Sequence, residues 1–210
     1  MGPRRARSVA TAAFGAGVAH AGAVGKPDAG IVIGLCGGLS PSLSEGTIVS
    51  YTECLSTETG QQPLRCSPLL VQREIALLTS KRLKCERVVG ITSPRVGTPL
   101  GEKTALVHSG ASVIDMESYE IIAAATQAGV PITVLRVVAD PADQKMPDFN
   151  RALKPDGDFD GWKALEIALG SPLLTARLIA ANRRAIQKLT PALEIVLGAD
   201  CFKQVRSQAY

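Results

Sequence analysis

The sequence predicts an α/β fold, because short runs of β-prone residues alternate with helix-like segments along a chain of ordinary globular composition. The chain has 210 residues, of which 46% are hydrophobic and 20% are charged. This composition excludes a disordered chain, and the length suits one domain with one core. Successive parallel strands need a crossover element between them, so the alternation favours a mainly parallel sheet. We therefore expect a single domain that spans residues 1–210.

Strands are expected where short apolar runs are bounded by glycine, proline or polar residues. The first run, Gly30–Gly34, follows a turn and opens into the glycine-rich segment Cys36–Gly38, which we interpret as a loop. The expected strands are residues 30–34, 46–51, 87–92, 111–116 and 131–138.

Helices are expected where apolar residues recur among polar ones at helical spacing. The helix that begins at Ser118 should end before Gly129 and Pro131, which are typical of helix ends. The stretch 141–160 is rich in Pro, Asp and Gly and is expected to be a long loop. The expected helices are residues 67–84, 103–108, 118–128, 162–169 and 171–189.

The first 25 residues fit two interpretations. A basic start followed by an uncharged stretch rich in Ala and Gly is the layout of a secretory signal, although the stretch contains no Leu or Ile. The other interpretation is a helix from Pro3 to His20, because proline suits the first position of a helix.

Charge and cysteine content exclude several classes of partner. The net charge is only +4, and the basic residues do not gather with aromatic ones into a stripe, so we expect no nucleic-acid partner. The five cysteines are an odd number and include no CxxC pair. This pattern argues against a disulfide framework or a metal site, and it indicates reduced thiols in a cytoplasmic protein.

Acidic residues follow two of the expected strands. Asp115–Glu117 ends one strand and Asp140 ends the next, and α/β proteins bind their ligands at the carboxyl ends of strands. The glycines of Cys36–Gly38 would let backbone N–H groups approach an anion or a sugar. Each feature also has a structural interpretation, with Glu117 as a helix cap, Asp140 as a turn initiator and the glycines as a tight turn.

Three motifs in one order carry a resemblance to a known family. The segments Gly34–Leu39, Val113–Ser118 and Leu135–Asp140, separated by gaps the length of a helix, resemble the superfamily of nucleoside phosphorylases and 5′-methylthioadenosine/S-adenosylhomocysteine nucleosidases. The resemblance implies a three-layer αβα fold with a mixed, mainly parallel central sheet, and it favours the helix interpretation of the first residues. The segments 26–28, 102–103 and 169–172 are most similar to the hopanoid-associated phosphorylases.

The resemblance also implies roles for the acidic residues. In that superfamily the last carboxylate of the acidic motif hydrogen-bonds the ribose hydroxyls, the methionine before it packs on the sugar, and the aspartate after the arginine strand faces the purine. Glu117 and Met116 would therefore bind ribose, and Asp140 would be the catalytic acid. Breaking an N-glycosidic bond leaves an oxocarbenium-like sugar and a base that departs poorly unless N7 is protonated. Asp140 would supply that proton, and Glu117 would oppose the positive charge on the sugar.

The nucleophile stays open between phosphate and water. Phosphorolysis is favoured, with inorganic phosphate as co-substrate and no cofactor, and the alternative is hydrolysis with a carboxylate base that activates water. Phosphate requires cationic or N–H donors, and the candidates are Cys36, Gly37, Gly38, Arg4, Arg5, Thr92 and Ser93.

The N-terminus is where the sequence departs from the superfamily. Relatives carry a strand and an acidic residue before the turn that Met1–Ala6 resembles, so the resemblance predicts an N-terminally shortened domain. A non-catalytic nucleoside-binding protein is therefore a further alternative.

The subgroup resemblance implies a purine nucleoside as the small-molecule partner. The substrate would be a 5′-substituted adenosine, namely adenosylhopane, which would release adenine in hopanoid biosynthesis. An apolar substrate implies transient membrane contact, and the superfamily implies a homo-oligomer.

Overall fold

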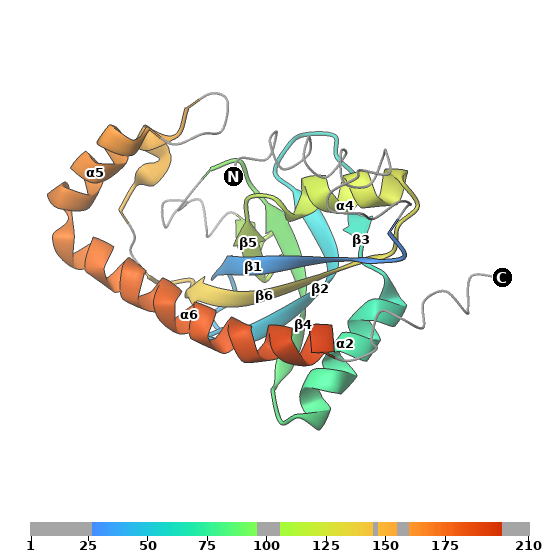
Figure 1. Ribbon diagram of the computed structural model, residues 1–210. Coiled ribbons are helices and arrows are strands. Elements are labelled where there is room, and N and C mark those ends of the chain that lie inside the picture. The colour runs from blue at the N-terminus through green and yellow to red at the C-terminus, as the bar shows by residue number, and fades with distance from the viewer. Residues whose placement is uncertain (1–26, 96–105, 145–146, 155–159, 199–210) are drawn as a thin grey trace.

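A strand-rich core flanked by helices forms the part of the chain that the structure describes, which in this computed structural model is residues 27–95, 106–144, 147–154 and 160–198 (Figure 1). The strands are β1 (Gly30–Gly38), β2 (Ile48–Ser56), β3 (Leu64–Arg65), β4 (Cys85–Thr92), β5 (Val113–Asp115) and β6 (Ile132–Asp140). The helices are α2 (Pro68–Ser80), α4 (Ser118–Gln127), the short 3₁₀ helix η1 (Phe149–Ala152), α5 (Gly161–Gly170) and α6 (Pro172–Gly198).

The strands pair in a closed ring. Pairing runs from β2 to β4, β5, β1 and β6, and β6 pairs back onto β2, while β3 adds to the other side of β2. The β1–β6, β2–β4 and β4–β5 pairs are parallel, and the β1–β5, β2–β3 and β2–β6 pairs are antiparallel. The sheet is therefore mixed as expected. The described parallel and antiparallel strand pairs are equally many, but the two long pairs, β1–β6 and β2–β4, are parallel, so the expected parallel character is partly confirmed. Closing the ring satisfies backbone groups that an open sheet would leave at its edges.

Strand β6 divides two apolar clusters between its two faces. Ile132, Val134 and Val138 lie in the cluster that includes residues of α4, whereas Leu135 and Val137 lie in the cluster that includes residues of α6. Side chains alternate along a strand, so Arg136 points to the same side as Val134 and Val138, which is the side of α4. The first eight residues of β6 are buried, as expected for a strand covered on both faces.

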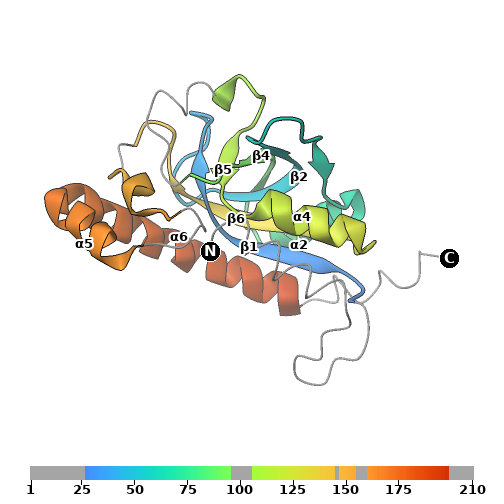
Figure 2. The same ribbon diagram turned by 90° about the horizontal axis from the view of Figure 1, so that it is seen from above.

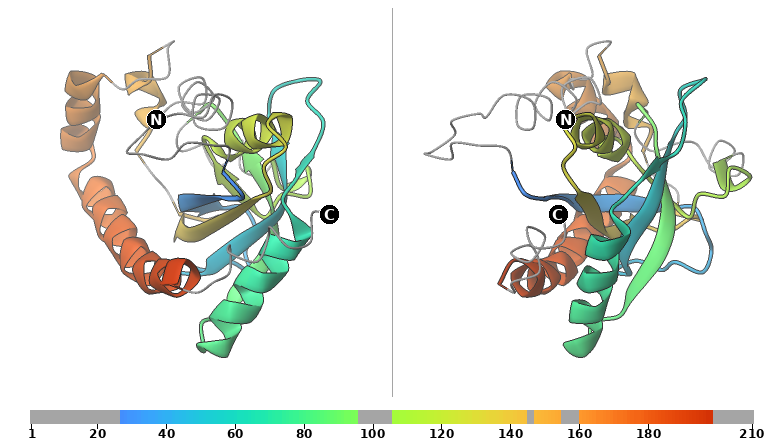
Figure 3. Two further views of the ribbon diagram at one scale, coloured as in Figure 1. Left: turned by 45° about the vertical axis from the view of Figure 1, so that its right-hand side comes forward. Right: turned by 90° about the vertical axis from the view of Figure 1, so that its right-hand side faces the viewer.

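Helices cover the strands from two sides. Helix α4 lies on one side, and α2 and α6 lie on the other (Figures 1 and 2). The views in Figure 3 show the same arrangement, with α5 set apart from the strands at the start of α6. The helices on both faces agree with the expected layers of helix, sheet and helix.

The expected elements are confirmed in number and order over most of the described chain, with four differences. The stretch 141–160, expected to be a long loop, contains the short 3₁₀ helix η1. The segment Cys36–Gly38, interpreted as a loop, is the end of β1. The two-residue strand β3 was not expected, because so short a run has no readable periodicity. Helix α6 continues to Gly198 through Pro191, which lies on its exposed side, where water can reach the carbonyl that proline leaves unbonded.

Some expectations fall beyond the described residues. The helix expected from Pro3 to His20 and the first half of the helix expected over 103–108 lie outside them. Among the described helices none is by itself long and apolar enough to cross a membrane, and the bent pair α5 and α6 passes that test only when the two are taken together.

One buried carboxyl group lies far along the chain from the acidic motifs. Glu74 of α2 has no solvent exposure, and the Thr133 hydroxyl donates a hydrogen bond of 2.6 Å to its Oε2. Burial raises the pKa of Glu74 to about 7, against the smaller opposing effects of the Thr133 hydrogen bond and of the nearby Ser50 hydroxyl. The protonated form is therefore favoured in the folded protein below about pH 7.

Glu74 should make the stability depend on pH. Between the pKa of an unfolded glutamate, about 4.3, and the raised value in the folded protein, only the folded state holds the proton. The free energy of unfolding should therefore fall as pH rises from about 4.5 to 7, by about 2–3 kcal/mol from this residue alone. Urea denaturation across this range should show that fall in the wild type and a flatter profile in Glu74→Gln. Parallel profiles would show that Glu74 is not the buried acid responsible.

Candidate active site

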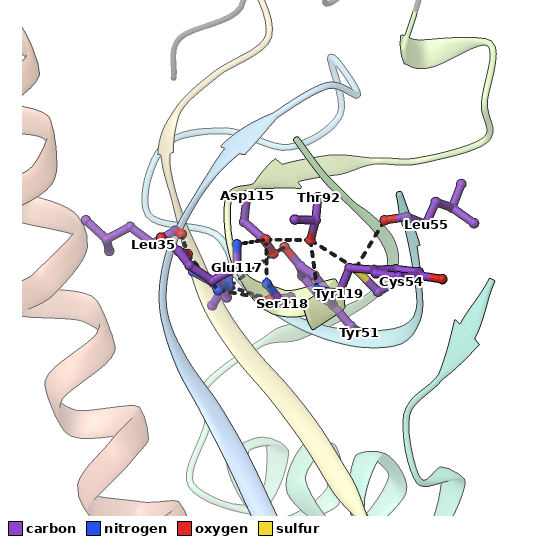
Figure 4. Close-up of polar contacts among 10 residues, drawn as sticks. Leu35, Tyr51, Cys54, Leu55, Thr92, Asp115, Glu117, Ser118 and Tyr119 are labelled. Atoms are coloured by element: carbon purple, nitrogen blue, oxygen red, sulfur yellow. Dashed lines mark hydrogen bonds and ion pairs between the residues drawn. The ribbon is translucent and has the colours of Figure 1, made fainter. Parts of the chain in front are cut away.

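The carboxylate of Asp115 is the centre of a buried polar network (Figure 4). The Tyr51 hydroxyl donates to its Oδ2 over 2.9 Å, and the Thr92 hydroxyl donates to its Oδ1 over 2.8 Å. The backbone amides of Glu117 and Ser118 also donate to Oδ1, over 3.0 and 2.9 Å. Asp115 therefore caps the start of α4, and its oxygens are satisfied although only 6% of the residue is exposed.

The guanidinium of Arg136 faces this carboxylate. Its Nε lies 3.3 Å from Asp115 Oδ2, and both side chains are almost fully buried. Burial raises the pKa of Asp115, but Arg136 and the hydrogen bonds from Ser118 and Thr92 lower it more, so the pKa lies below its ordinary value. The pair is therefore ionised inside the protein, where each charge offsets the cost of burying the other.

Glu117 lies at the edge of the same network. It occupies the residue before α4, but its side chain makes no capping hydrogen bond, because Asp115 takes that role. Its Oε2 lies 3.5 Å from Arg136 Nη2, and 24% of the side chain is exposed. Burial raises the pKa of Glu117, and the nearby Arg136 cation partly opposes that rise. The interpretation of Glu117 as a simple helix cap is therefore wrong.

Asp140 and the acidic motif meet on either side of one glycine. Gly37 of β1 is the register partner of both Ile114 in β5 and Asp140 in β6. A β-carbon at Gly37 would lie 2.9 Å from Asp140 Oδ2 and 3.1 Å from the Ile114 side chain. The hydrogen of glycine is thus what allows the Asp140 carboxylate to lie over β1.

Two other glycines make room for site residues in the same way. A β-carbon at Gly34 would lie 2.8 Å from Arg136 Nη1, and one at Gly90 would overlap the ring of Tyr51. The glycines near the site therefore lie under polar or aromatic side chains of neighbouring strands. The expected anion loop at Cys36–Gly38 is corrected accordingly, since these residues are paired as strand β1.

The other phosphate candidates are used within the protein or lie outside the described residues. The Thr92 hydroxyl donates to Asp115 and accepts the Tyr119 amide over 2.9 Å. Ser93 is 4% exposed, and its hydroxyl accepts the Arg95 amide over 3.2 Å. Cys36 is buried, and burial raises the pKa of its thiol, so it is a structural residue. Arg4 and Arg5 lie outside the described residues, and Met116 is half-buried beside Glu117.

Sequence reasoning missed the residues that hold the acidic motif. Arg136 was quoted within a motif without a role, and Tyr51 and Ser118 were not singled out. A charged residue in the middle of an otherwise apolar strand, as in Leu135-Arg136-Val137, is the signal that could have identified Arg136. For metals, no group of three or more His, Cys, Asp or Glu side chains within the described ranges is arranged to hold an ion.

The fold and the motifs agree with one enzyme family. Residues 1–158 match the Phosphorylase superfamily, and the chain belongs to it. No curated protein matches the sequence significantly. The family comprises enzymes that cleave glycosidic bonds of nucleosides, either as phosphorylases or as nucleosidases.

Solved structures with similar folds are nucleoside-cleaving enzymes. The futalosine hydrolase of Helicobacter pylori strain 26695 has a TM-score of 0.69 at 14% identity, covering 94% of this chain and 76% of that one. The 5′-methylthioadenosine/S-adenosylhomocysteine nucleosidase of the same species, in complex with a pyrrolopyrimidine–pyrrolidinol compound, gives the same four values. The nucleosidase of Colwellia psychrerythraea 34H, in complex with adenine, has a TM-score of 0.64 at 17% identity, covering 94% of this chain and 74% of that one. At these identities the similarity establishes the fold.

Removing the Asp115 charge should destabilise the protein strongly. In Asp115→Asn the Arg136 cation stays buried without its counter-ion, and a loss of about 3–5 kcal/mol in the free energy of unfolding is expected. Urea denaturation at pH 7 measures the loss. The control is Glu45→Gln, which breaks the largely exposed pair of Glu45 with Arg184 and should change stability little. Equal small effects of the two variants would contradict the ionised buried pair.

Proposed function

We propose that this chain cleaves the N-glycosidic bond of a 5′-substituted adenosine and releases adenine. The observation that carries the proposal is that Gly37 of β1 pairs with both Asp140 and Ile114, which lies three residues before Glu117, while Arg136 from the strand of Asp140 contacts Glu117. The family and the adenine bound to one similar structure support an adenine nucleoside as the small-molecule ligand.

The two carboxylates would divide the work between sugar and base. Glu117 is partly exposed and close to a cation, so it is suited to accept hydrogen bonds from ribose hydroxyls and to oppose the positive charge that the sugar gains. Asp140 would donate a proton to N7 of the purine, so that the base leaves in neutral form. Met116, between Asp115 and Glu117, would pack against the sugar.

Replacing the proposed acid should remove turnover but keep binding. Asp140→Asn preserves shape and loses the proton, and a fall in kcat of about 10²–10⁴-fold is expected. Adenine release from adenosine and 5′-methylthioadenosine measures the fall, and calorimetry measures nucleoside affinity. Asp143→Asn, at an exposed aspartate three residues later, is the matched control and should behave as wild type. An active Asp140→Asn enzyme would refute the acid role.

A methyl group at Gly37 should displace the same carboxylate without removing it. Because its β-carbon would come within 2.9 Å of Asp140 Oδ2, we expect Gly37→Ala to lower kcat by at least about tenfold in a folded protein. Gly38→Ala is the comparison, since its nearest contacts are at 3.4 Å, and it should have a clearly smaller effect. Similar losses in both variants would count against the positioning of Asp140 by Gly37.

Phosphate is the proposed nucleophile, and water is the second candidate. The subgroup resemblance supports phosphorolysis, whereas the similar structures, a futalosine hydrolase and a nucleosidase, favour hydrolysis. The described candidates Thr92 and Ser93 are engaged in internal hydrogen bonds, so other groups would have to bind the phosphate.

Phosphate dependence separates these two reactions. If phosphate is the nucleophile, adenine release in phosphate-free buffer should be negligible and should rise to saturation as inorganic phosphate is added. The second product should be the 1-phosphate of the substrate's ribose, which keeps any 5′-substituent. Adenine release that is unchanged when phosphate is removed would replace phosphorolysis by hydrolysis.

The particular substrate and pathway are proposed from the subgroup resemblance. It supports adenosylhopane as the substrate within hopanoid biosynthesis and transient membrane contact while the apolar substrate is collected. The wider superfamily supports a homo-oligomer, and the reduced cysteines support a cytoplasmic location. A reaction of this class needs no cofactor besides phosphate.

A further inference from the structure

The proposed reaction gives Arg136 no task, yet every nitrogen of its guanidinium has a partner. Nε faces Asp115 and donates to the Ser118 hydroxyl over 3.1 Å. Nη2 donates to Ser118 over 2.9 Å and to Glu117 Oε2 over 3.5 Å, and Nη1 donates to the Leu35 carbonyl over 2.8 Å. The partners come from β1, β5 and the start of α4, so the plane of the guanidinium is fixed from three directions.

The surroundings of Arg136 leave it little freedom. It is 4% exposed, and the guanidinium lies over Gly34, where a β-carbon would come within 2.8 Å of Nη1. A lysine has one ammonium group and could not reach Asp115, Leu35, Ser118 and Glu117 at once. The site thus contains a planar cation in one orientation.

Asp115 and Glu117 differ in how much they depend on this cation. Asp115 also receives hydrogen bonds from two hydroxyls and two backbone amides. Glu117 is the outer carboxylate, and the charged groups of the described residues that act on it are Arg136 from β6 and Asp115 from β5, with opposite signs. Arg136 therefore contacts two different carboxylates. Asp115 is fixed by other hydrogen bonds, whereas Glu117 is partly exposed.

We propose that Arg136 is a positioning residue that orients the Glu117 carboxylate toward the ribose and keeps it in the acceptor form that hydroxyl groups require. This inference rests on the proposed function, because it assumes that Glu117 binds the sugar. Ser118 assists by holding the guanidinium in place, and Gly34 assists by leaving space for it.

The sign of the pH effect follows from the charges. Glu117 accepts hydrogen bonds from ribose when ionised, so affinity should be lost as pH falls through its pKa. Burial raises that pKa most, the Arg136 cation lowers it, and Asp115 raises it further. Without Arg136 the acid limb of the pH profile of kcat/KM should therefore move to higher pH.

Three variants test the proposal by steady-state kinetics of adenine release across pH 5–9. Arg136→Lys keeps the charge but loses the several N–H donors of the planar guanidinium. We expect KM to rise by about tenfold, with kcat within about threefold of the wild type. Arg136→Gln should add the upward shift of the acid limb. Gly34→Ala leaves every charge in place and pushes on Nη1, and it should raise KM without moving the acid limb. Arg184→Lys, at an exposed arginine, is the control and should match wild type.

Stability is measured on the same samples, because a buried arginine also supports the fold. If Arg136→Gln fails to fold, Ser118→Ala and Gly34→Ala carry the test, with a raised KM as the expected result. Folded variants with unchanged KM and an unmoved acid limb would overturn the positioning role and show that Arg136 is structural only. A wild type that releases adenine from no nucleoside would instead refute the proposed function itself.

Discussion

The buried ion pair between Asp115 and Arg136 is the interaction on which the site depends. Through it and its hydrogen bonds, β2 contributes Tyr51, β4 contributes Thr92, and β1 contributes the Leu35 carbonyl. Together with β5 and β6 these are the five strands that close the ring, and Asp115 also caps α4. A buried pair gains little stability over a well-packed apolar core, but leaving one of its charges alone is costly. The pair is thus better understood as a constraint on geometry than as a source of stability.

Glycines provide the space that this geometry needs. Three glycines each lie under a side chain from a neighbouring strand. Gly34 lies under Arg136, Gly37 under Asp140 and Gly90 under Tyr51. Strand backbones are only about 4.8 Å apart, so a polar side chain can lie across the next strand only where that strand has no β-carbon. Glycine in these strands therefore serves side-chain placement, and it does so without the turn conformation that glycine-rich segments usually indicate.

The order of elements could be predicted from the sequence, because strand and helix periodicities are strong in Gly30–Gly34, Ile132–Val138 and the segment after Ser118. The position of the acidic residues at strand ends was equally readable. The role of Cys36–Gly38 was not, since a glycine pair reads the same whether it forms a loop or lies beneath another side chain. The pairing of β2 with β6 could not be predicted from local sequence patterns either. It joins residues almost ninety positions apart, such as Ile48 and Val137.

The account makes one central claim, that a nucleoside lies with its ribose on Glu117 and its base on Asp140, at a site where Arg136 fixes the orientation of Glu117. The most direct measurement is a crystal structure of the Asp140→Asn variant with adenosine bound. It should show the ribose hydroxyls within hydrogen-bond distance of the Glu117 carboxylate, that carboxylate still facing Arg136, and the purine edge at residue 140. A nucleoside bound elsewhere, or a Glu117 side chain turned away from the ribose, would contradict the account.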